Sequence, residues 1–168
     1  MLEKILVSSC LLGQKVRYNG TDKKIGDNRL DKWLQEGRVI PFCPEVAAAL
    51  PVPRAPAEIS GGDGNQVHDG TAEVIDADMQ NVSKYFVEGA KLAFAEAKRA
   101  EVKVALLKAD SPSCGNKDIH DGTFSGKKIV GSGVTAALLE KKGIPVFNEN
   151  ELGAMDSYVR NLENMDKN

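Results

Sequence analysis

Short apolar runs alternate along this chain with segments of helical periodicity, and this alternation is the feature that most constrains the fold. The apolar runs cover residues 5–7, 39–42, 102–109 and 144–147. Helical patterns fill the intervals, at residues 27–37, 82–97, 131–139 and 151–162. Strands that are separated by helices pair in parallel, because each helix carries the chain back across the sheet. The pattern predicts an α/β, Rossmann-like three-layer fold with a mostly parallel sheet.

No repeat, linker or low-complexity tract divides the 168 residues, so we expect a single domain over residues 1–168. Residues 60–80 are rich in glycine and aspartate, which predicts an excursion or flap outside the core. The polar segment 116–128 predicts a hairpin or lid. Residues 151–162 predict a C-terminal helix.

The charge balance limits the classes of partner. The chain has 22 Lys and Arg against 24 Asp and Glu. Proteins normally bind duplex DNA and membrane surfaces through clustered positive charge, so we expect neither partner. A small-molecule substrate agrees better with this charge balance. No run approaches the roughly 20 apolar residues that span a bilayer, and the first residues lead directly into an apolar run rather than a signal segment. We therefore expect a cytoplasmic protein.

Each of the three cysteines follows closely on an apolar run; they are Cys10, Cys43 and Cys114. An odd count in a chain without an export signal argues against a disulfide framework. Ligands of parallel α/β sheets bind outside the carboxyl ends of the strands. We therefore expect the three thiols to converge on one edge of the sheet, despite their separation in sequence.

Three converging thiolates are typical of two kinds of open metal site. One is a catalytic zinc with a free position, and the other is an iron-sulfur cluster with one iron not bound by protein. Only His68 and His120 could complete a zinc set, and both lie in polar, Gly-rich segments. Soft thiolates at wide spacing favour the cluster, which is larger than one ion. A non-catalytic metal-binding or redox-sensing module is the alternative from another functional class.

Four motifs occur in order along the chain, over roughly residues 3–152: Ser9–Gly13 with Arg17–Gly20, Cys43–Glu45 followed by Pro51–Arg54, Ser111–Gly115, and Gly131–Thr135. Together they resemble the bacterial thiouracil desulfurase family. The resemblance implies a 4Fe-4S cluster held by Cys10, Cys43 and Cys114, with a fourth iron free to bind the substrate's sulfur. It also implies conversion of thiouracil to uracil and sulfide. One departure is the run of alanines at 47–49, where glycine is expected in many relatives.

Replacing C=S by C=O requires an acceptor for sulfur, an activated water and donors for the developing charge. Glu45, two residues beyond Cys43, is predicted to activate water or to protonate the base. Its structural alternative is a carboxylate that stabilises a helix start. Ser111 is predicted as a second catalytic group that hydrogen-bonds substrate or cluster sulfur.

Three further side chains are predicted to bind substrate: Ser9, Ser113 and Arg54. Arg54 would offset the charge of a thiolate-bound cluster or hold an anion, and its alternative is an exposed loop arginine. Ser111 and Ser113 both have the alternative of only capping the turn. The turn Gly131–Gly133 could offer amides to an anion or only permit close packing.

The leading hypothesis is iron-sulfur-dependent, non-redox desulfuration of a thiolated pyrimidine. The alternative within enzymes is sulfur transfer into or out of tRNA with the same cluster. The near-neutral composition, with a net charge of -2, weakens that alternative because RNA-binding modules carry clustered basic residues.

Overall fold

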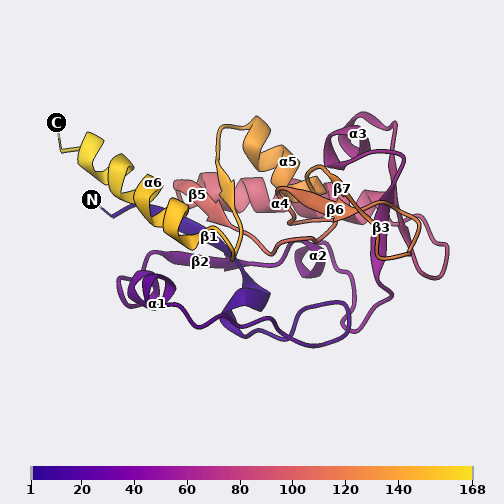
Figure 1. Ribbon diagram of the computed structural model, residues 1–168, viewed down its shortest axis with the longest axis horizontal. Coiled ribbons are helices and arrows are strands. Elements are labelled where there is room, and N and C mark those ends of the chain that lie inside the picture. Colours follow the sequence, from indigo (N-terminus) through magenta and orange to yellow (C-terminus); the bar gives the residue numbers. More distant parts are fainter. Residues whose placement is uncertain (1, 168) are drawn as a thin grey trace.

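The apolar runs form one four-stranded parallel sheet in the computed structural model, which describes residues 2–167 (Figure 1). The strands are β1 (Lys4–Ser8), β2 (Val39–Phe42), β5 (Val102–Leu106) and β8 (Val146–Phe147). Their order across the sheet is β2-β1-β5-β8, and every neighbouring pair is parallel. The predicted α/β fold with a mostly parallel sheet is confirmed.

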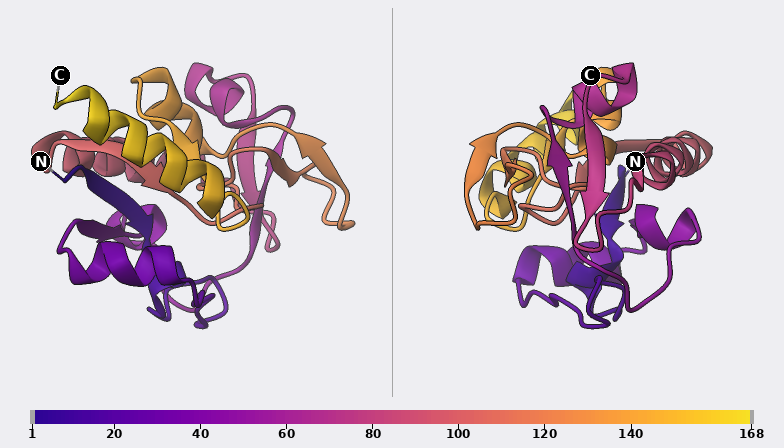
Figure 2. Two further views of the ribbon diagram at one scale, coloured as in Figure 1. Left: turned by 60° about the vertical axis from the view of Figure 1, so that its left-hand side comes forward. Right: turned by 90° about the vertical axis from the view of Figure 1, so that its right-hand side faces the viewer.

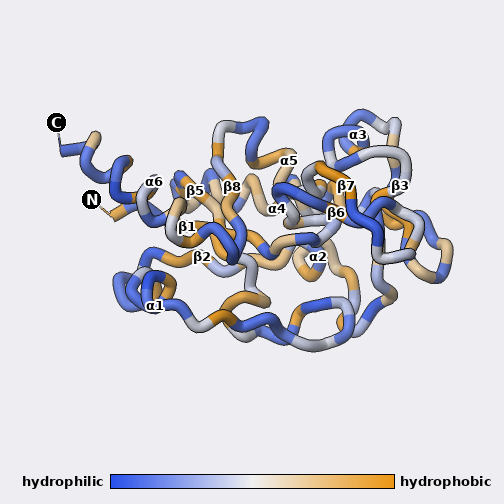
Figure 3. Tube along the Cα trace, viewed as in Figure 1, coloured by the Kyte–Doolittle hydropathy of each residue, from blue (hydrophilic) through white to orange (hydrophobic). Residues whose placement is uncertain are grey.

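Helices cover both faces of this sheet. Helices α1 (Asn28–Gln35) and α6 (Leu152–Met165) pack on one face, and α4 (Ser83–Arg99) and α5 (Val134–Lys141) pack on the other. The right-hand view of Figure 2 shows α6 and α4 on opposite sides of the strands. Apolar residues concentrate in the central strands, and polar residues on the outer surfaces of the helices (Figure 3). The central strands are therefore buried on both faces, as expected of a parallel sheet.

Successive side chains of β1 enter the two cores alternately, because neighbouring residues of a strand point to opposite faces. Ile5 and Val7 pack against α1 and α6, whereas Leu6 packs toward α4 and α5. Helix α1 buries Leu30 and Trp33 as its pattern predicts. Leu34, expected on the same apolar face, is exposed instead.

The Gly-rich segment lies apart from the parallel sheet, but the prediction that it contributes nothing to a core is wrong, since Val67, Ala72 and Val74 are buried. It runs through β3 (Ala57–Ser60), α3 (Gly64–Asp69) and β4 (Glu73–Asp76), and β3 and β4 pair as an antiparallel hairpin. Buried apolar residues from this hairpin form a third core with α4: Ile59, Val67, Ala72, Val74, Phe86 and Ala90. These residues are buried through long-range contacts with α4, together with Ile119 of β6 and Val134 of α5.

The predicted hairpin in the polar segment after the third cysteine is confirmed. Strands β6 (Asp118–His120) and β7 (Lys128–Val130) pair in antiparallel fashion, and Ile119 of β6 is buried in the third core. This hairpin packs beside β3, so the two hairpins lie together at the end of the molecule away from the two termini (Figure 1).

Strand β5 is shorter than its apolar run, and the last two amides of the run, those of Lys108 and Ala109, donate to side chains. The amide of Lys108 donates to the Ser8 hydroxyl at 3.0 Å, and the amide of Ala109 donates to the Glu149 carboxylate at 2.6 Å. The ladder with neighbouring strands is thereby replaced by side-chain acceptors at the carboxyl end of the sheet.

The last strand and the last helix also differ in length from the prediction. Strand β8 starts after Pro145, which has no N–H to donate to a ladder. Helix α6 extends to Met165, three residues beyond the predicted end. No helix among residues 2–167 has both the length and the apolar character to cross a membrane.

The sheet order creates a switch point at the carboxyl ends of β1 and β5. From β1 the chain reaches β2 on one side and, later, β5 on the other. Loops that leave neighbouring strands in opposite directions open a crevice between them, and ligands of open α/β sheets bind there.

Candidate functional site

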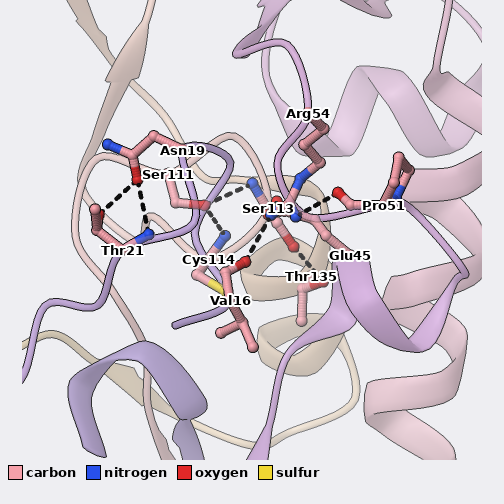
Figure 4. A network of polar contacts seen from close by, with 10 residues as sticks. All are labelled: Val16, Asn19, Thr21, Glu45, Pro51, Arg54, Ser111, Ser113, Cys114 and Thr135. Atoms are coloured by element: carbon pink, nitrogen blue, oxygen red, sulfur yellow. Dashed lines mark hydrogen bonds and ion pairs between the residues drawn. The ribbon is translucent and has the colours of Figure 1, made fainter. Parts of the chain in front are cut away.

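All three cysteines are free thiols and line one cavity of about 680 Å³ at this switch point. Cys10 lies in the short helix η1 (Ser9–Leu12), directly after β1, and Cys43 follows β2. Cys114 lies in the loop after β5 (Figure 4). Strands β1 and β2 end level with each other, since Ser8 pairs with Phe42. The convergence predicted from the sequence is confirmed.

Burial raises the pKa of each of these thiols. The pKa of Cys10 rises to about 11, first because of burial and then because of the neighbouring Cys43. The pKa values of Cys43 and Cys114 also rise by burial, and the carboxylate of Glu45 is the second cause at both. Without a bound cation the three thiols are therefore mainly protonated at neutral pH.

The donor set fits an iron-sulfur cluster. No three His, Cys, Asp or Glu side chains within residues 2–167 are arranged to hold a single metal ion. A cluster takes each thiolate at a separate iron, which suits thiols that come from three different segments around one cavity. His68, considered as a zinc ligand, is not among the residues that line the cavity, and its Nε2 lies 2.8 Å from the carbonyl oxygen of Val134.

Glu45 lies in the first turn of α2 (Pro44–Ala47), and its side chain lines the cavity. Its carboxylate forms an ion pair with Arg54 (Figure 4). The Arg54 guanidinium also donates to the carbonyl oxygens of Pro51, at 3.2 Å, and Val16, at 3.1 Å. Both charged side chains are largely buried, with exposed fractions of 16% for Glu45 and 9% for Arg54. Arg54 therefore fixes the Glu45 carboxylate in the cavity wall. No local pattern in the sequence predicted this ion pair.

Helix α2 is held in close contact with α4. A Cβ atom on Gly89 of α4 would lie 2.5 Å from the carbonyl oxygen of Pro44. Only glycine allows this approach, and it sets the position of the segment that carries both Cys43 and Glu45.

Ser111 organises the turn that presents Cys114. Its hydroxyl oxygen accepts hydrogen bonds from the backbone amides of Ser113, at 3.1 Å, and Cys114, at 3.0 Å (Figure 4). Ser111 and Ser9 both line the cavity. A hydrogen bond with the Ser8 side chain acts on the Cys114 thiol and lowers its pKa, which opposes the effect of burial. Sequence reasoning gave Ser8 no role, although its place at the end of an apolar run was a signal.

Ser113 does not reach the cavity, and its predicted contact with substrate is wrong. It is fully buried, and its hydroxyl lies 2.9 Å from the hydroxyl of Thr135. The reason is the packing of the turn against α5: the Ser113 carbonyl accepts from the amides of Thr135, at 2.8 Å, and Ala136, at 3.1 Å. The hydroxyl and the carbonyl group of Ser113 thus both point toward α5.

The Gly-Ser-Gly turn before α5 offers no free amides to an anion, and close packing is its role. The amide of Gly133 donates to the Gly115 carbonyl at 2.7 Å, and that of Val134 donates to the Pro112 carbonyl at 2.8 Å. A Cβ on Gly133 would lie 2.5 Å from the Ser113 carbonyl oxygen. The start of α5 therefore holds the Cys114 loop in place.

Charged residues of both signs line the cavity. Besides the pair Glu45 and Arg54, the basic ones are Arg17, Lys23 and Lys108, and the acidic ones are Glu58, Asp76, Asp78 and Asp110. Lys108 and Arg17 both lower the pKa of Cys10, because a nearby positive charge favours the thiolate. Arg17 begins one of the motifs found in the sequence, whereas Glu58, Asp76 and Asp78 come from a distant segment that no motif marks.

Comparison with known proteins agrees with this geometry. The family model for 2-thiouracil desulfurase matches residues 5–151. A protein of Bacillus subtilis (strain 168) named Uncharacterized protein YbbK is 47% identical over 148 residues, which cover 88% of this chain and 97% of that protein. A solved structure named [4Fe-4S]-dependent thiouracil desulfidase TudS is 43% identical, with a TM-score of 0.85, and the match covers 94% of this chain and 98% of that one. This chain belongs to the 2-thiouracil desulfurase family.

Proposed function

We propose that this protein is a 4Fe-4S-dependent, non-redox desulfurase that converts a thiolated pyrimidine such as thiouracil, together with water, into uracil and sulfide. One observation carries the proposal: three free thiols from three separate segments line one cavity in a chain of the 2-thiouracil desulfurase family. The TudS relative is named as a [4Fe-4S]-dependent thiouracil desulfidase, which supports the same cofactor and substrate class here.

Cys10, Cys43 and Cys114 would hold the cluster as thiolates. When bound, the cluster supplies an iron without a protein ligand, which is a soft acceptor for the substrate's sulfur. Lys108 and Arg17 offset the negative charge that three thiolates bring into a buried place, since both lower the pKa of Cys10.

Glu45 is the proposed acid-base group. Its carboxylate accepts a proton from the water whose oxygen replaces the sulfur, and Arg54 keeps that carboxylate at a fixed place in the cavity wall. Ser111 is the proposed donor to substrate or to sulfur. Its oxygen already accepts two backbone amides, so its single O–H is left to donate. Ser9 lines the cavity as a further candidate contact for substrate.

The proposal includes a cytoplasmic location and a small-molecule substrate. Free cysteines persist in a reducing compartment. The cavity is lined by residues of this one chain and has a volume of about 680 Å³, which suits a free base or a small derivative of it.

The test is anaerobic purification or reconstitution, followed by iron and sulfide counts and a sulfide-release assay on 2-thiouracil. Anaerobic handling is needed because an open cluster is lost in air. We expect about four irons per chain, uracil and sulfide in equal amounts, and loss of both iron and activity in each of Cys10→Ser, Cys43→Ser and Cys114→Ser.

Three results would contradict the proposal in different ways. Stable zinc binding, together with a failure to reconstitute iron, would show that the site does not hold an iron-sulfur cluster. Desulfuration of thiolated tRNA but not of free thiouracils would assign the protein to RNA sulfur chemistry. A loaded protein that releases no sulfide from any of them would be a non-catalytic metal-binding module.

A further inference from the structure

Lys108, two residues beyond the end of β5, carries a cation that is held in the cavity wall. Its ammonium nitrogen forms an ion pair with the Glu149 carboxylate at 3.0 Å and donates to the Ala109 carbonyl at 2.9 Å. The other oxygen of Glu149 accepts from the Ala109 amide at 2.6 Å, so the carboxylate is itself fixed. A charge held in this way needs no reorganisation when a ligand of opposite charge arrives.

The ammonium group of Lys108 has one donor to spare. A lysine ammonium carries three N–H donors. Its ion pair with Glu149 and its bond to Ala109 occupy no more than two of them, and it has no third partner among residues 2–167. The side chain lines the cavity and is 19% exposed, so it is not sealed off by protein. A molecule in the cavity can therefore accept the third N–H.

The positive end of the Lys108–Glu149 pair faces the thiol of Cys10. Lys108 lowers the pKa of that thiol and Glu149 raises it, and the effect of Lys108 is the larger of the two. The backbone gives the same placement. The Lys108 amide donates to the Ser8 hydroxyl at 3.0 Å, and the Ser8 side chain hydrogen-bonds the Cys114 thiol. Lys108 therefore lies beside the part of the wall that presents Cys10 and Cys114.

The proposed reaction moves a negative charge onto sulfur. When water replaces the C=S bond of thiouracil by C=O, both electron pairs of that bond leave with the sulfur. One proton of the water joins the sulfur and the other goes to the Glu45 carboxylate, so the products are uracil and the hydrosulfide anion, without net oxidation or reduction. A cation beside the departing sulfur stabilises the transition state and the anion more than the neutral substrate.

We propose that Lys108 is a catalytic residue whose third N–H binds the departing sulfur as hydrosulfide. The inference rests on the proposed desulfurase function. The contact strengthens as charge grows on the sulfur, so its loss lowers kcat, leaves the KM for thiouracil nearly unchanged and weakens the binding of hydrosulfide.

Arg17 is the competing cation in the cavity wall. It also lowers the pKa of Cys10, but its effect is smaller than that of Lys108. Its guanidinium carbon lies 5.6 Å from the centre of the Tyr18 ring, and Tyr18 is partly exposed. Within residues 2–167 Arg17 forms no ion pair that would fix it as Glu149 fixes Lys108. Lys108 is therefore the better preorganised of the two.

The test compares the cluster-loaded wild type with Lys108→Met and Lys108→Arg. Methionine has a similar length without the charge, and arginine keeps the charge. Substrate-free protein is titrated anaerobically with sodium sulfide, and visible absorption gives the Kd for hydrosulfide; uracil formation gives kcat and KM. The Met variant is expected to raise this Kd and to lower kcat by about 10- to 100-fold, the scale of one lost charge-assisted hydrogen bond. The Arg variant is expected to restore most of both losses.

A double variant guards against misfolding. In Lys108→Met alone the Glu149 carboxylate loses its counter-ion, whereas Lys108→Met combined with Glu149→Gln leaves no unpaired charge. The double variant is expected to show the same weakening of hydrosulfide binding. Wild-type hydrosulfide Kd in both variants would overturn the proposal. A loss that accompanies a lower iron content and that arginine does not restore would overturn it as well, because Lys108 would then serve only to retain the cluster.

Lys117→Met is the matched control. Lys117 pairs with Glu151 at the same distance of 3.0 Å but does not line the cavity, so hydrosulfide Kd and kcat are expected to stay at the wild-type values. Arg17→Met is the competing variant. If it weakens hydrosulfide binding and Lys108→Met does not, the anion belongs to Arg17 and the proposal is overturned.

The two proposals fail in distinguishable ways. Normal turnover and normal hydrosulfide Kd in Lys108→Met overturn the role of Lys108 and leave the desulfurase function standing. A loaded wild type that binds hydrosulfide but releases none from thiouracil overturns the desulfurase function, and the Kd of the Met variant still decides whether Lys108 binds the anion. A chain that cannot be loaded with iron overturns both.

Discussion

At the scale of single residues, charged side chains of the cavity hold other groups in place. Arg54 is bonded to Glu45 and to two backbone carbonyls. Lys108 is bonded to the Glu149 carboxylate at 3.0 Å and to the Ala109 carbonyl at 2.9 Å. A carboxylate restrained in this way keeps the orientation that proton transfer needs.

Glu45→Gln separates the proton-transfer role of Glu45 from its structural role. Glutamine keeps the shape and a hydrogen bond to Arg54 but loses the basic oxygen, so sulfide release is expected to fall about 100-fold with normal iron content. Glu96→Gln is the matched control, because Glu96 also pairs with an arginine, Arg99, but lies on the exposed side of α4. Near-normal turnover in Glu45→Gln would reassign this carboxylate to the helix start.

Ala49 adopts a backbone conformation that favours glycine, with φ of 70°. It belongs to the run of alanines where the sequence resemblance leads one to expect glycine. The left-handed conformation costs a non-Gly residue about 1–2 kcal/mol, part of which the greater freedom of unfolded glycine offsets. Ala49→Gly is therefore expected to stabilise the fold by about 0.5–1 kcal/mol, or roughly 1–4 °C in Tm.

Ala48→Gly provides the comparison for thermal unfolding. Ala48 has an ordinary φ of -82°, so glycine there gains nothing in the folded state and is expected to lower Tm. A lower Tm for Ala49→Gly as well would show that residue 49 is not strained.

At the scale of elements, the contact between α4 and α2 sets the position of Cys43 and Glu45. In Gly89→Ala the new Cβ meets the Pro44 carbonyl, so the backbone of α2 has to move. We expect a loss of about 1–3 kcal/mol in stability and a lower iron content after reconstitution. Gly153→Ala on α6 is the control, because its Cβ meets only the flexible guanidinium of Arg29, at 3.3 Å. Equal Tm and iron content in the two variants would contradict this prediction.

The carboxylate of Asp27, at the start of α1, makes the stability of the fold depend on pH. Asp27 caps α1 and accepts from the amide and the guanidinium of Arg29, and the Arg29 side chain is the main cause that lowers the pKa of Asp27 to about 2. The folded pKa lies below the ordinary value of 3.8, so the carboxylate stabilises the fold above about pH 4, and this contribution is lost as pH falls toward 2.

Asp27→Ala is accordingly expected to cost about 1 kcal/mol at neutral pH. Denaturant unfolding of wild type and variant should converge as pH falls from about 4 toward 2. Asp31→Ala, in the first turn of the same helix, is the control and should change stability less. A constant difference at all pH values would show that the charge of Asp27 does not contribute.

Local signals made most element positions predictable. Asp27 before an apolar period and Gly37 after it bound α1 correctly, and an apolar run ended by polar residues located β1. The burial of Val67 and Val74 was not predictable, because the apolar residues that cover them come from distant segments such as α4.

The sequence predicted that the three cysteines lie together, but it did not predict the contacts between side chains within the site. Parallel strands share one carboxyl edge, so the cysteines could be brought together from their places after apolar runs. The orientation of Ser113 depends on amides of α5, which lie about 20 residues further along the chain. The pairing of Arg54 with Glu45 depends on a loop between them whose path no local pattern defines.

At the scale of the whole molecule, three apolar cores hold the described chain together. A protein of this size buries enough apolar surface to fold without a metal, unlike a zinc finger. Removal of iron by a chelator is therefore expected to leave the far-UV circular dichroism spectrum unchanged and to lower Tm by several degrees through loss of the bound group. Collapse of the helical signal would show that the cluster is required for folding.

Because the Cys114 loop is held in place by α5, the site cannot form until α5 has been synthesised. Cys10 leaves the ribosome early, whereas the helix that fixes Cys114 ends at Lys141. At about 5–20 residues per second, the roughly 130 residues between these points take about 7 to 26 s to synthesise. A nascent chain therefore displays one or two thiols long before the third has its place, and the proposed cluster has to be delivered after α5 has been synthesised.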